Sequence, residues 1–171
     1  RRTRNNHGTW YDAQAVGYAL FTGRREVARE ILEDVPENRI AKHFEPDRRQ
    51  PHELARTKSY GYSVMNLSGF FNLAAYGEHF AMDLWRVQPD GAAGLRKGLD
   101  WIVEHAFGDG EWDYQNLTPI KPGQLLPLLR RAAIAYDDPA YEQKLQELAG
   151  EEWKTDRVNL LYPPPVVTKP E

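Results

Sequence analysis

The spacing of apolar residues constrains this chain most, because it repeats at helical intervals along most of the sequence. After residue 8, apolar and small residues fall on one helical face until Gly23 ends the pattern; they are Trp10, Ala13, Val16, Gly17, Leu20 and Phe21. No segment alternates apolar and polar residues convincingly, as a half-buried strand would. The sequence therefore predicts an all-α protein.

Glycine and proline divide this pattern into separate helices. The predicted helices run from just after His7 to Gly23 and over residues 24–35, 59–76, 95–106, 124–136 and 139–153, with a long loop at 37–56. Consecutive helices of this kind form antiparallel αα-hairpins, which build either a solenoid or part of an (α/α) toroid, an incomplete barrel. The absence of a fixed-period sequence repeat argues against a regular solenoid.

Stacked hairpins would begin their first, third and fifth helices on one rim. Helix N-termini present free N–H groups and the positive end of the helix dipole, so this rim favours anionic ligands. Basic residues near these helix starts add positive charge: Arg1, Arg2, Arg4, Arg48, Arg49, Arg56, Lys58 and Lys121.

Composition excludes several classes of function. With 22 Lys and Arg against 25 Asp and Glu, the net charge is −3, which offers no overall positive field for nucleic acid. No apolar run approaches the roughly 18 residues that a membrane-spanning helix needs. Cysteine is absent, and neither His nor acidic residues show a metal-ligand spacing, so we expect no metal or other cofactor.

Two motifs carry a family resemblance: Asn5-Asn6-His7-Gly8-Thr9-Trp10-Tyr11-Asp12, and Glu53-Leu54-Ala55-Arg56-Thr57 followed by Tyr60-Gly61-Tyr62-Ser63. In this order they resemble the alginate lyase family of α/α-toroid polysaccharide lyases, over residues 1 to about 153. The spacing around the tyrosines looks closer to a branch that includes lyases of glucuronan-like polymers.

The resemblance also implies a domain organisation. Residues 1–158 would form the C-terminal half of a longer lyase catalytic domain, and residues 159–171 an extended, proline-rich tail. The expected partners are an acidic polysaccharide, either alginate or a glucuronan-like polymer, and the N-terminal half of the same protein. The family further implies a periplasmic or secreted location.

The implied chemistry is β-elimination, in which the C5 proton of a uronate leaves and the O4 substituent is expelled. Asn6, His7 and Arg56 match the residues that neutralise the sugar carboxylate, so that the C5 proton becomes acidic enough to remove. Tyr62 matches the catalytic tyrosine, the acid for the leaving oxygen and, in syn elimination, also the base. A tyrosine with its ordinary pKa of roughly 10 needs a nearby cation for that second task. His7 is the alternative base, and the sequence leaves both routes open.

Further residues are candidates for substrate binding. Aromatic rings stack on sugar faces and cations hold carboxylates; the candidates are Trp10, Tyr11, Tyr60, Trp112 and Tyr114, and Arg48, Arg49 and Lys58. Each has a structural alternative. The alternative for Asn6 and His7 is an ordinary helix start. The alternative for Tyr62 is packing in the core, with Tyr60 as the catalytic tyrosine instead. The alternative for Arg48 and Arg49 is a solvated loop.

Two other functions fit the same sequence. A glycoside hydrolase on a similar scaffold would need a pair of carboxylates, for which the candidates are Asp12, Glu53, Asp109, Glu111 and Asp113. A non-catalytic helical module would bind a glycan or a protein without turnover.

Overall fold

The computed structural model describes residues 3–163, apart from the side chain of Glu152, and divides into two compact units, residues 1–120 and 121–171. Within residues 3–163 the chain forms helices, turns and loops but no β-strand, and the isolated bridge between Lys58 and Asn116 is not extended into a sheet. This confirms the prediction of an all-α protein.

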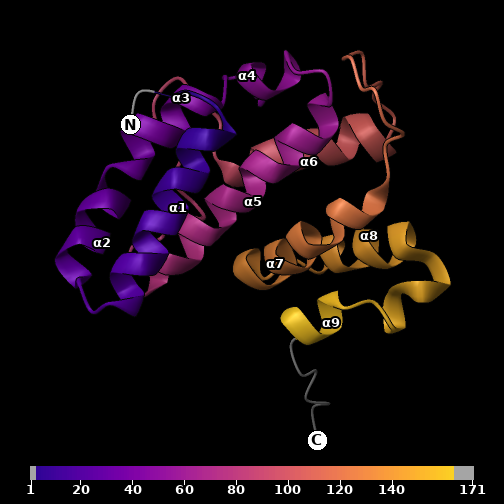
Figure 1. The fold of residues 1–171 in the computed structure, drawn as a ribbon. Coiled ribbons are helices and arrows are strands. Elements are labelled where there is room, and N and C mark those ends of the chain that lie inside the picture. Colours follow the sequence, from indigo (N-terminus) through magenta and orange to yellow (C-terminus); the bar gives the residue numbers. More distant parts are fainter. Residues whose placement is uncertain (1–2, 164–171) are drawn as a thin grey trace, which may run out of the picture. The chain divides into compact units, whose positions relative to one another are not determined.

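The first unit contains two long hairpins with short helical turns between them. Its elements are α1 (Asn6–Phe21), α2 (Arg25–Glu33), a π-helical turn (Pro36–Ile40), α3 (Ala41–His43), α4 (Pro51–Leu54), α5 (Ser59–Glu78) and α6 (Leu95–Phe107). Helix α1 packs against α2, and α5 packs against α6, as the hairpin prediction requires. Helix α1 also lies along α5, so the two hairpins share a core (Figure 1).

Helices α1 and α5 run in the same direction and begin at the same end of the unit. Near their starts the Thr9 hydroxyl donates to Asn66 Oδ1 at 2.6 Å. Further along, a Cβ added at Gly17 would lie 3.2 Å from the Tyr76 hydroxyl oxygen, so the missing side chain lets the helices approach. The shared rim predicted for the first and third helices is therefore present.

The predicted loop at residues 37–56 is partly helical, which corrects the sequence interpretation. The π-helical turn, α3 and α4 are each five residues or fewer, too short to show a helical period. Their order comes from burial of Ile40, Phe44 and Leu54 in the core of the first unit. The segment is thus a folded support rather than a free loop.

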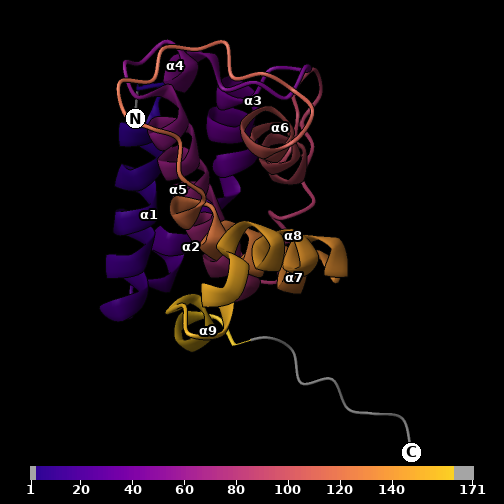
Figure 2. The same ribbon diagram turned by 90° about the vertical axis from the view of Figure 1, so that its right-hand side faces the viewer.

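The loop after α6 returns to the start of α5. Leu117 N–H donates to the Thr57 carbonyl at 2.9 Å, and the Ser59 hydroxyl donates to the Gln115 carbonyl at 2.8 Å. Figure 2 shows this segment passing the end of the unit where α4 lies. Residues 115–117 therefore lie beside the start of α5, on the shared rim.

The second unit is built on one hairpin, α7 (Leu126–Tyr136) with α8 (Pro139–Ala149). A 3-10 turn (Pro122–Gln124) precedes it, and a 3-10 helix (Gly150–Lys154) and α9 (Val158–Leu161) follow. Asp138 caps α8, with Pro139 in the first turn, because the Asp138 carboxylate accepts from Ala140 N–H at 3.0 Å.

The start of the predicted extended tail differs from expectation, because residues 159–161 belong to α9. Tertiary contacts explain this: the buried Arg130 guanidinium donates to Asn159 Oδ1 at 2.9 Å and to the Tyr162 carbonyl at 2.9 Å. Pro163 is described, whereas Pro164 and Pro165 lie outside the described residues.

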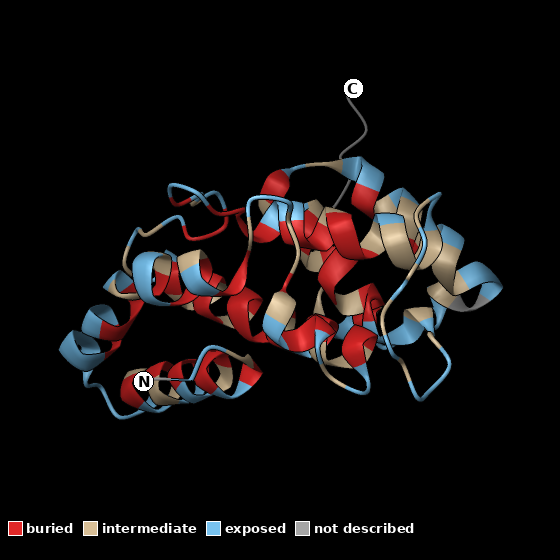
Figure 3. Cartoon of the chain, turned by 90° about the horizontal axis from the view of Figure 1, so that it is seen from above, coloured by how far each residue is buried: buried red, intermediate tan, exposed pale blue. Residues whose placement is uncertain are grey.

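Burial follows the helix faces in each unit, with buried residues toward the interior and exposed residues on outer turns and loops (Figure 3). In the described part of the chain, no helix combines the length and apolarity needed to cross a bilayer.

Candidate active site

The site begins at the N-terminus of α1, where Asn5 is the N-cap. Its side-chain oxygen accepts from His7 N–H at 3.2 Å, and its backbone is extended. Thr9 and Asp12 have the spacing of a capping box, but none forms there, because the helix has already started and the Thr9 hydroxyl is buried against Asn66. His7 lies in the first turn and is exposed.

Asn6 is buried and held by one carboxylate. The backbone N–H of Asn6 donates to Glu53 Oε1 at 2.5 Å, and its Nδ2 donates to Glu53 Oε2 at 2.6 Å. Because Glu53 belongs to α4, these bonds tie the start of α1 to the segment that leads into α5.

Glu53 is only 1% exposed. Burial raises the pKa of its carboxyl above the ordinary value, opposed by the Asn6 hydrogen bonds and by the nearby Arg56 and His52 charges. Its backbone carbonyl accepts from Arg56 N–H at 3.0 Å, so Glu53 contacts Asn6 and Arg56, two of the three candidate carboxylate-neutralising residues.

Arg56 and Tyr62 are in direct contact. The guanidinium carbon of Arg56 lies 4.0 Å from the centre of the Tyr62 ring, a cation–π geometry. Both side chains are half-buried, and Tyr62 lies in the first turn of α5. The structure thus brings together a guanidinium and a phenol at the end of the unit where Asn6 and His7 begin α1.

Tyr60 does not fit the predicted role of a sugar-stacking residue. Its side chain is 3% exposed, and its ring meets Phe107 and Trp112 edge to face, at centroid distances of 6.0 and 5.6 Å. Burial raises the pKa of its phenol. The two tyrosines stand two residues apart near a helix start, so they face different sides: Tyr60 enters the core, and Tyr62 stays partly accessible.

A buried polar network surrounds Asn66 on α5, and the sequence did not predict it. Asn66 Nδ2 donates to Gln50 Oε1 at 2.8 Å and lies 3.2 Å from His43 Nδ1, while Gln50 Nε2 donates to the Ser63 carbonyl at 3.3 Å. Asn66 follows Tyr62 by one helical turn. The sequence feature that could have predicted this network is Asn66 itself, a polar residue among the apolar residues of α5.

An ion pair that the sequence did not reveal anchors the first motif. Arg39 Nε donates to Asp12 Oδ2 at 2.7 Å, and both side chains are 3% exposed. Arg39 Nη1 donates to the Thr3 carbonyl at 2.7 Å. A Cβ at Gly8 would lie 2.6 Å from both Arg39 Nη1 and the Thr3 oxygen, so only glycine fits there.

The predicted cationic residues differ in their surroundings. Arg48 pairs with Glu104 at 3.0 Å, and Arg49 pairs with Asp47 at 2.6 Å. The hydrogen bond from Arg49 lowers the pKa of the Asp47 carboxyl. Both arginines thus already have anionic partners, although these pairs are exposed enough to exchange. Lys58 is exposed beside the start of α5.

The predicted aromatic residues of the loop after α6 form one cluster. Trp112 and Tyr114 are half-buried and pack against each other and against Trp101. Trp112 Nε1 donates to the Ser59 hydroxyl at 2.9 Å, and Arg49 Nη1 donates to the Tyr114 hydroxyl at 3.4 Å. Both rings therefore lie next to the start of α5, with part of each accessible.

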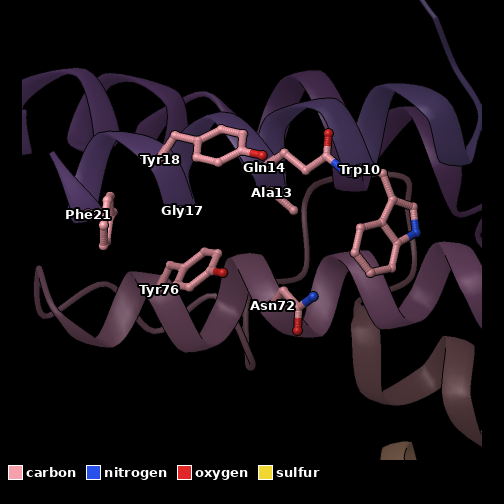
Figure 4. Close-up of a pocket in the computed structure, with 8 residues that line it drawn as sticks. All are labelled: Trp10, Ala13, Gln14, Gly17, Tyr18, Phe21, Asn72 and Tyr76. Carbon is pink, nitrogen blue, oxygen red and sulfur yellow. The ribbon is translucent and has the colours of Figure 1, made fainter.

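Trp10 and Tyr11 belong to the first motif and lie on α1, one turn after Asn6 and His7. Tyr11 is exposed, and Trp10 Nε1 donates to the Met65 carbonyl at 2.9 Å. Trp10 also lines a pocket of about 460 Å³ between α1 and α5 (Figure 4). The lining residues are Trp10, Ala13, Gln14, Gly17, Tyr18, Phe21, Asn72 and Tyr76. Asn6, His7, Arg56 and Tyr62 do not line this pocket.

Two carboxylates considered for a hydrolase are engaged elsewhere. Asp12 is paired with Arg39, and Glu53 is bonded to Asn6. The other three, Asp109, Glu111 and Asp113, are exposed on the loop after α6. Within the described residues, no group of three or more His, Cys, Asp or Glu side chains is arranged to hold a metal ion.

Comparison with known proteins gives two findings. The model of the family described as alginate lyase matches residues 1–112. The chain also superimposes on the crystal structure of an alginate lyase from Bacteroides ovatus, with a TM-score of 0.86 and 29% sequence identity. That match covers 94% of this chain and 43% of the other, so this chain spans less than half of the solved protein. A comparison with curated proteins gave no match. The structural match confirms the predicted fold class, helical hairpins that form part of an (α/α) toroid.

Proposed function

The chain belongs to the alginate lyase family, and from that premise we propose that the protein it comes from is a polysaccharide lyase that cleaves an acidic polyuronate by β-elimination. The observation that carries this proposal is the cluster at the shared start of α1 and α5: a buried amide held by Glu53, an exposed imidazole beside it, and a guanidinium over a phenol.

Asn6, His7 and Arg56 are the proposed carboxylate-neutralising residues. Removing a C5 proton places negative charge on the adjacent carboxylate, and hydrogen-bond donors fixed in advance stabilise that charge more than mobile water does. Asn6 is fixed by two hydrogen bonds, which supports this role. Arg56 is held through its backbone and through the Tyr62 ring.

Tyr62 is the proposed acid for the leaving O4. Its partial exposure and its contact with Arg56 support the choice over Tyr60, which is enclosed in the core. In syn elimination the same phenol is also the base, and the Arg56 guanidinium lies 4.0 Å from the centre of its ring. For the uronate epimer with the opposite C5 configuration, the exposed His7 is the alternative base.

The proposed substrate is alginate or a glucuronan-like polymer. Arg48, Arg49 and Lys58 would hold carboxylates of flanking sugars, and Trp10, Tyr11, Trp112 and Tyr114 would stack on sugar faces. The partial exposure of these side chains near the helix starts supports that role, whereas the burial of Tyr60 removes it from the set.

We further propose that a preceding part of the same polypeptide completes the site. The solved lyase is more than twice the matched length, since the match covers 43% of it. At the other end of α1 from the site, Tyr18 is 71% and Phe21 88% exposed, and these large rings offer the preceding part an apolar surface to pack on. As in the family, we propose a periplasmic or secreted location.

Removal of the Tyr62 hydroxyl tests the function directly. In the complete polypeptide, Tyr62→Phe should lower kcat by roughly 10²–10⁴-fold, the contribution of a proton-transfer group. The matched control is Tyr60→Phe, which removes a hydroxyl from the core and should keep most activity. Full activity of Tyr62→Phe rules out its role as the acid, and normal turnover by Arg56→Ala rules out the neutralising role.

The assay follows double-bond formation by ultraviolet absorbance on purified mannuronan, guluronan and glucuronan. A lyase creates an unsaturated uronate, whereas a hydrolase creates new reducing ends without that chromophore. A non-catalytic module would bind a polymer and produce neither signal. Either of the last two results overturns the proposed function.

A further inference from the structure

Glu53 is a buried carboxylate for which the elimination chemistry itself has no use. At 1% exposure it has lost nearly all contact with water, and burying such a group costs free energy unless its oxygens are hydrogen-bonded. Both oxygens accept from the same residue, at 2.5 Å from the backbone N–H of Asn6 and at 2.6 Å from its Nδ2. Such short contacts between segments 47 residues apart indicate a specific pairing.

A carboxylate accepts hydrogen bonds and, when ionised, cannot donate one. It therefore dictates which end of the Asn6 amide faces it, because a flipped amide would set its oxygen against a carboxylate oxygen. The Nδ2 group carries two hydrogens, and only one is needed for Glu53. Fixing the amide in this orientation leaves the second hydrogen for another acceptor.

Glu53 also connects Asn6 to Arg56. Its backbone N–H donates to the Gln50 carbonyl at 3.0 Å, and its carbonyl accepts from Arg56 N–H at 3.0 Å. The side chain and backbone of one residue thus link a donor in the first turn of α1, Asn6, to a donor in the turn between α4 and α5, Arg56.

We propose that Glu53 is a positioning residue: it orients the Asn6 amide so that its second Nδ2 hydrogen meets the sugar carboxylate, in register with Arg56. This inference rests on the proposed function and extends it to a residue that does not touch the substrate. The role is preorganisation, so it affects turnover more than substrate binding.

The test is a double-mutant cycle in the complete polypeptide, measured as kcat and KM on the best polyuronate. Glu53→Gln keeps the shape but replaces one acceptor by a donor, which permits the amide to flip. We expect kcat to fall by about 10- to 100-fold, the range for a lost hydrogen bond to a charged group, with KM within about threefold. The exposed Glu37→Gln serves as the matched control and should behave as wild type.

The Asn6→Ala background separates positioning from general structural damage. If Glu53 acts through Asn6, then adding Glu53→Gln to Asn6→Ala should lower kcat by less than about twofold further. The same loss in both backgrounds, or near-wild-type kcat for Glu53→Gln alone, overturns the inference. Should Glu53→Gln not fold, Glu53→Asp takes its place in the cycle, because it keeps the charge but shortens the reach.

The outcomes for the two proposals differ. If Tyr62→Phe is inactive and Glu53→Gln is fully active, the lyase function is supported and the positioning role of Glu53 is wrong. A wild-type protein that forms no double bond on any polyuronate overturns both.

Discussion

The ion pair between Asp12 and Arg39 gives the sharpest prediction about stability. Both side chains are 3% exposed and their atoms lie 2.7 Å apart, so neither water nor salt screens the pair. Asp12→Asn keeps the shape of the side chain but removes its charge, and it leaves the Arg39 cation buried without an anionic partner.

The expected cost is about 3 kcal/mol of unfolding free energy, the lower end of the range for breaking a buried pair, because the asparagine oxygen still accepts from Arg39. A matched control exists on the surface. Asp83 pairs with Arg86 at 3.1 Å, but these side chains are 51% and 57% exposed. Asp83→Asn should therefore cost less than about 1 kcal/mol.

Urea unfolding of the complete polypeptide, followed by tryptophan fluorescence, measures both variants. A cost for Asp12→Asn no larger than that for Asp83→Asn refutes the reasoning, since burial would then add nothing. A second check removes both charges. Asp12→Asn combined with Arg39→Met should be less destabilising than the sum of the two single changes, because no charge is left unpaired.

Two further stability predictions follow. At Gly98 a Cβ would lie 2.4 Å from Phe44 Cε1, so Gly98→Ala should lower the free energy of unfolding in urea by about 1–3 kcal/mol. The control is Gly123→Ala, where a Cβ would have nothing within 4 Å and stability should change by less than about 0.5 kcal/mol. Equal effects of the two substitutions would contradict the packing argument. Burial lowers the pKa of His43 to about 3. Below about pH 6.5 the unfolded chain therefore binds a proton that the folded chain does not, so the free energy of unfolding decreases as the pH is lowered. Between pH 7.5 and 5 the wild type should lose about 2 kcal/mol more of its free energy of unfolding than His43→Gln does. The control His79→Gln, at an exposed position, should match the wild type. Parallel pH profiles for wild type and His43→Gln would count against this account.

Local features of the chain were predictable because their cause lies within a few residues. In α6 and α7 apolar residues recur three and four positions apart, so the helical period is visible in the sequence. The Asp138-Pro139 cap is equally local. The same holds for the residue types of the candidate site, since Asn6, His7, Arg56 and Tyr62 stand within two short motifs.

Tertiary structure decided which of these residues meet and which side chains are covered. Asn6 contacts Glu53 across 47 positions, Asp12 contacts Arg39 across 27, and Thr9 contacts Asn66 across 57. It also separated Tyr60 from Tyr62, and it folded residues 36–54 into short helical turns against the core. Helix periodicity reports only which face of a helix is apolar. The partner of each buried polar group depends on packing between distant segments, because a buried donor or acceptor must be satisfied by whatever that packing brings near.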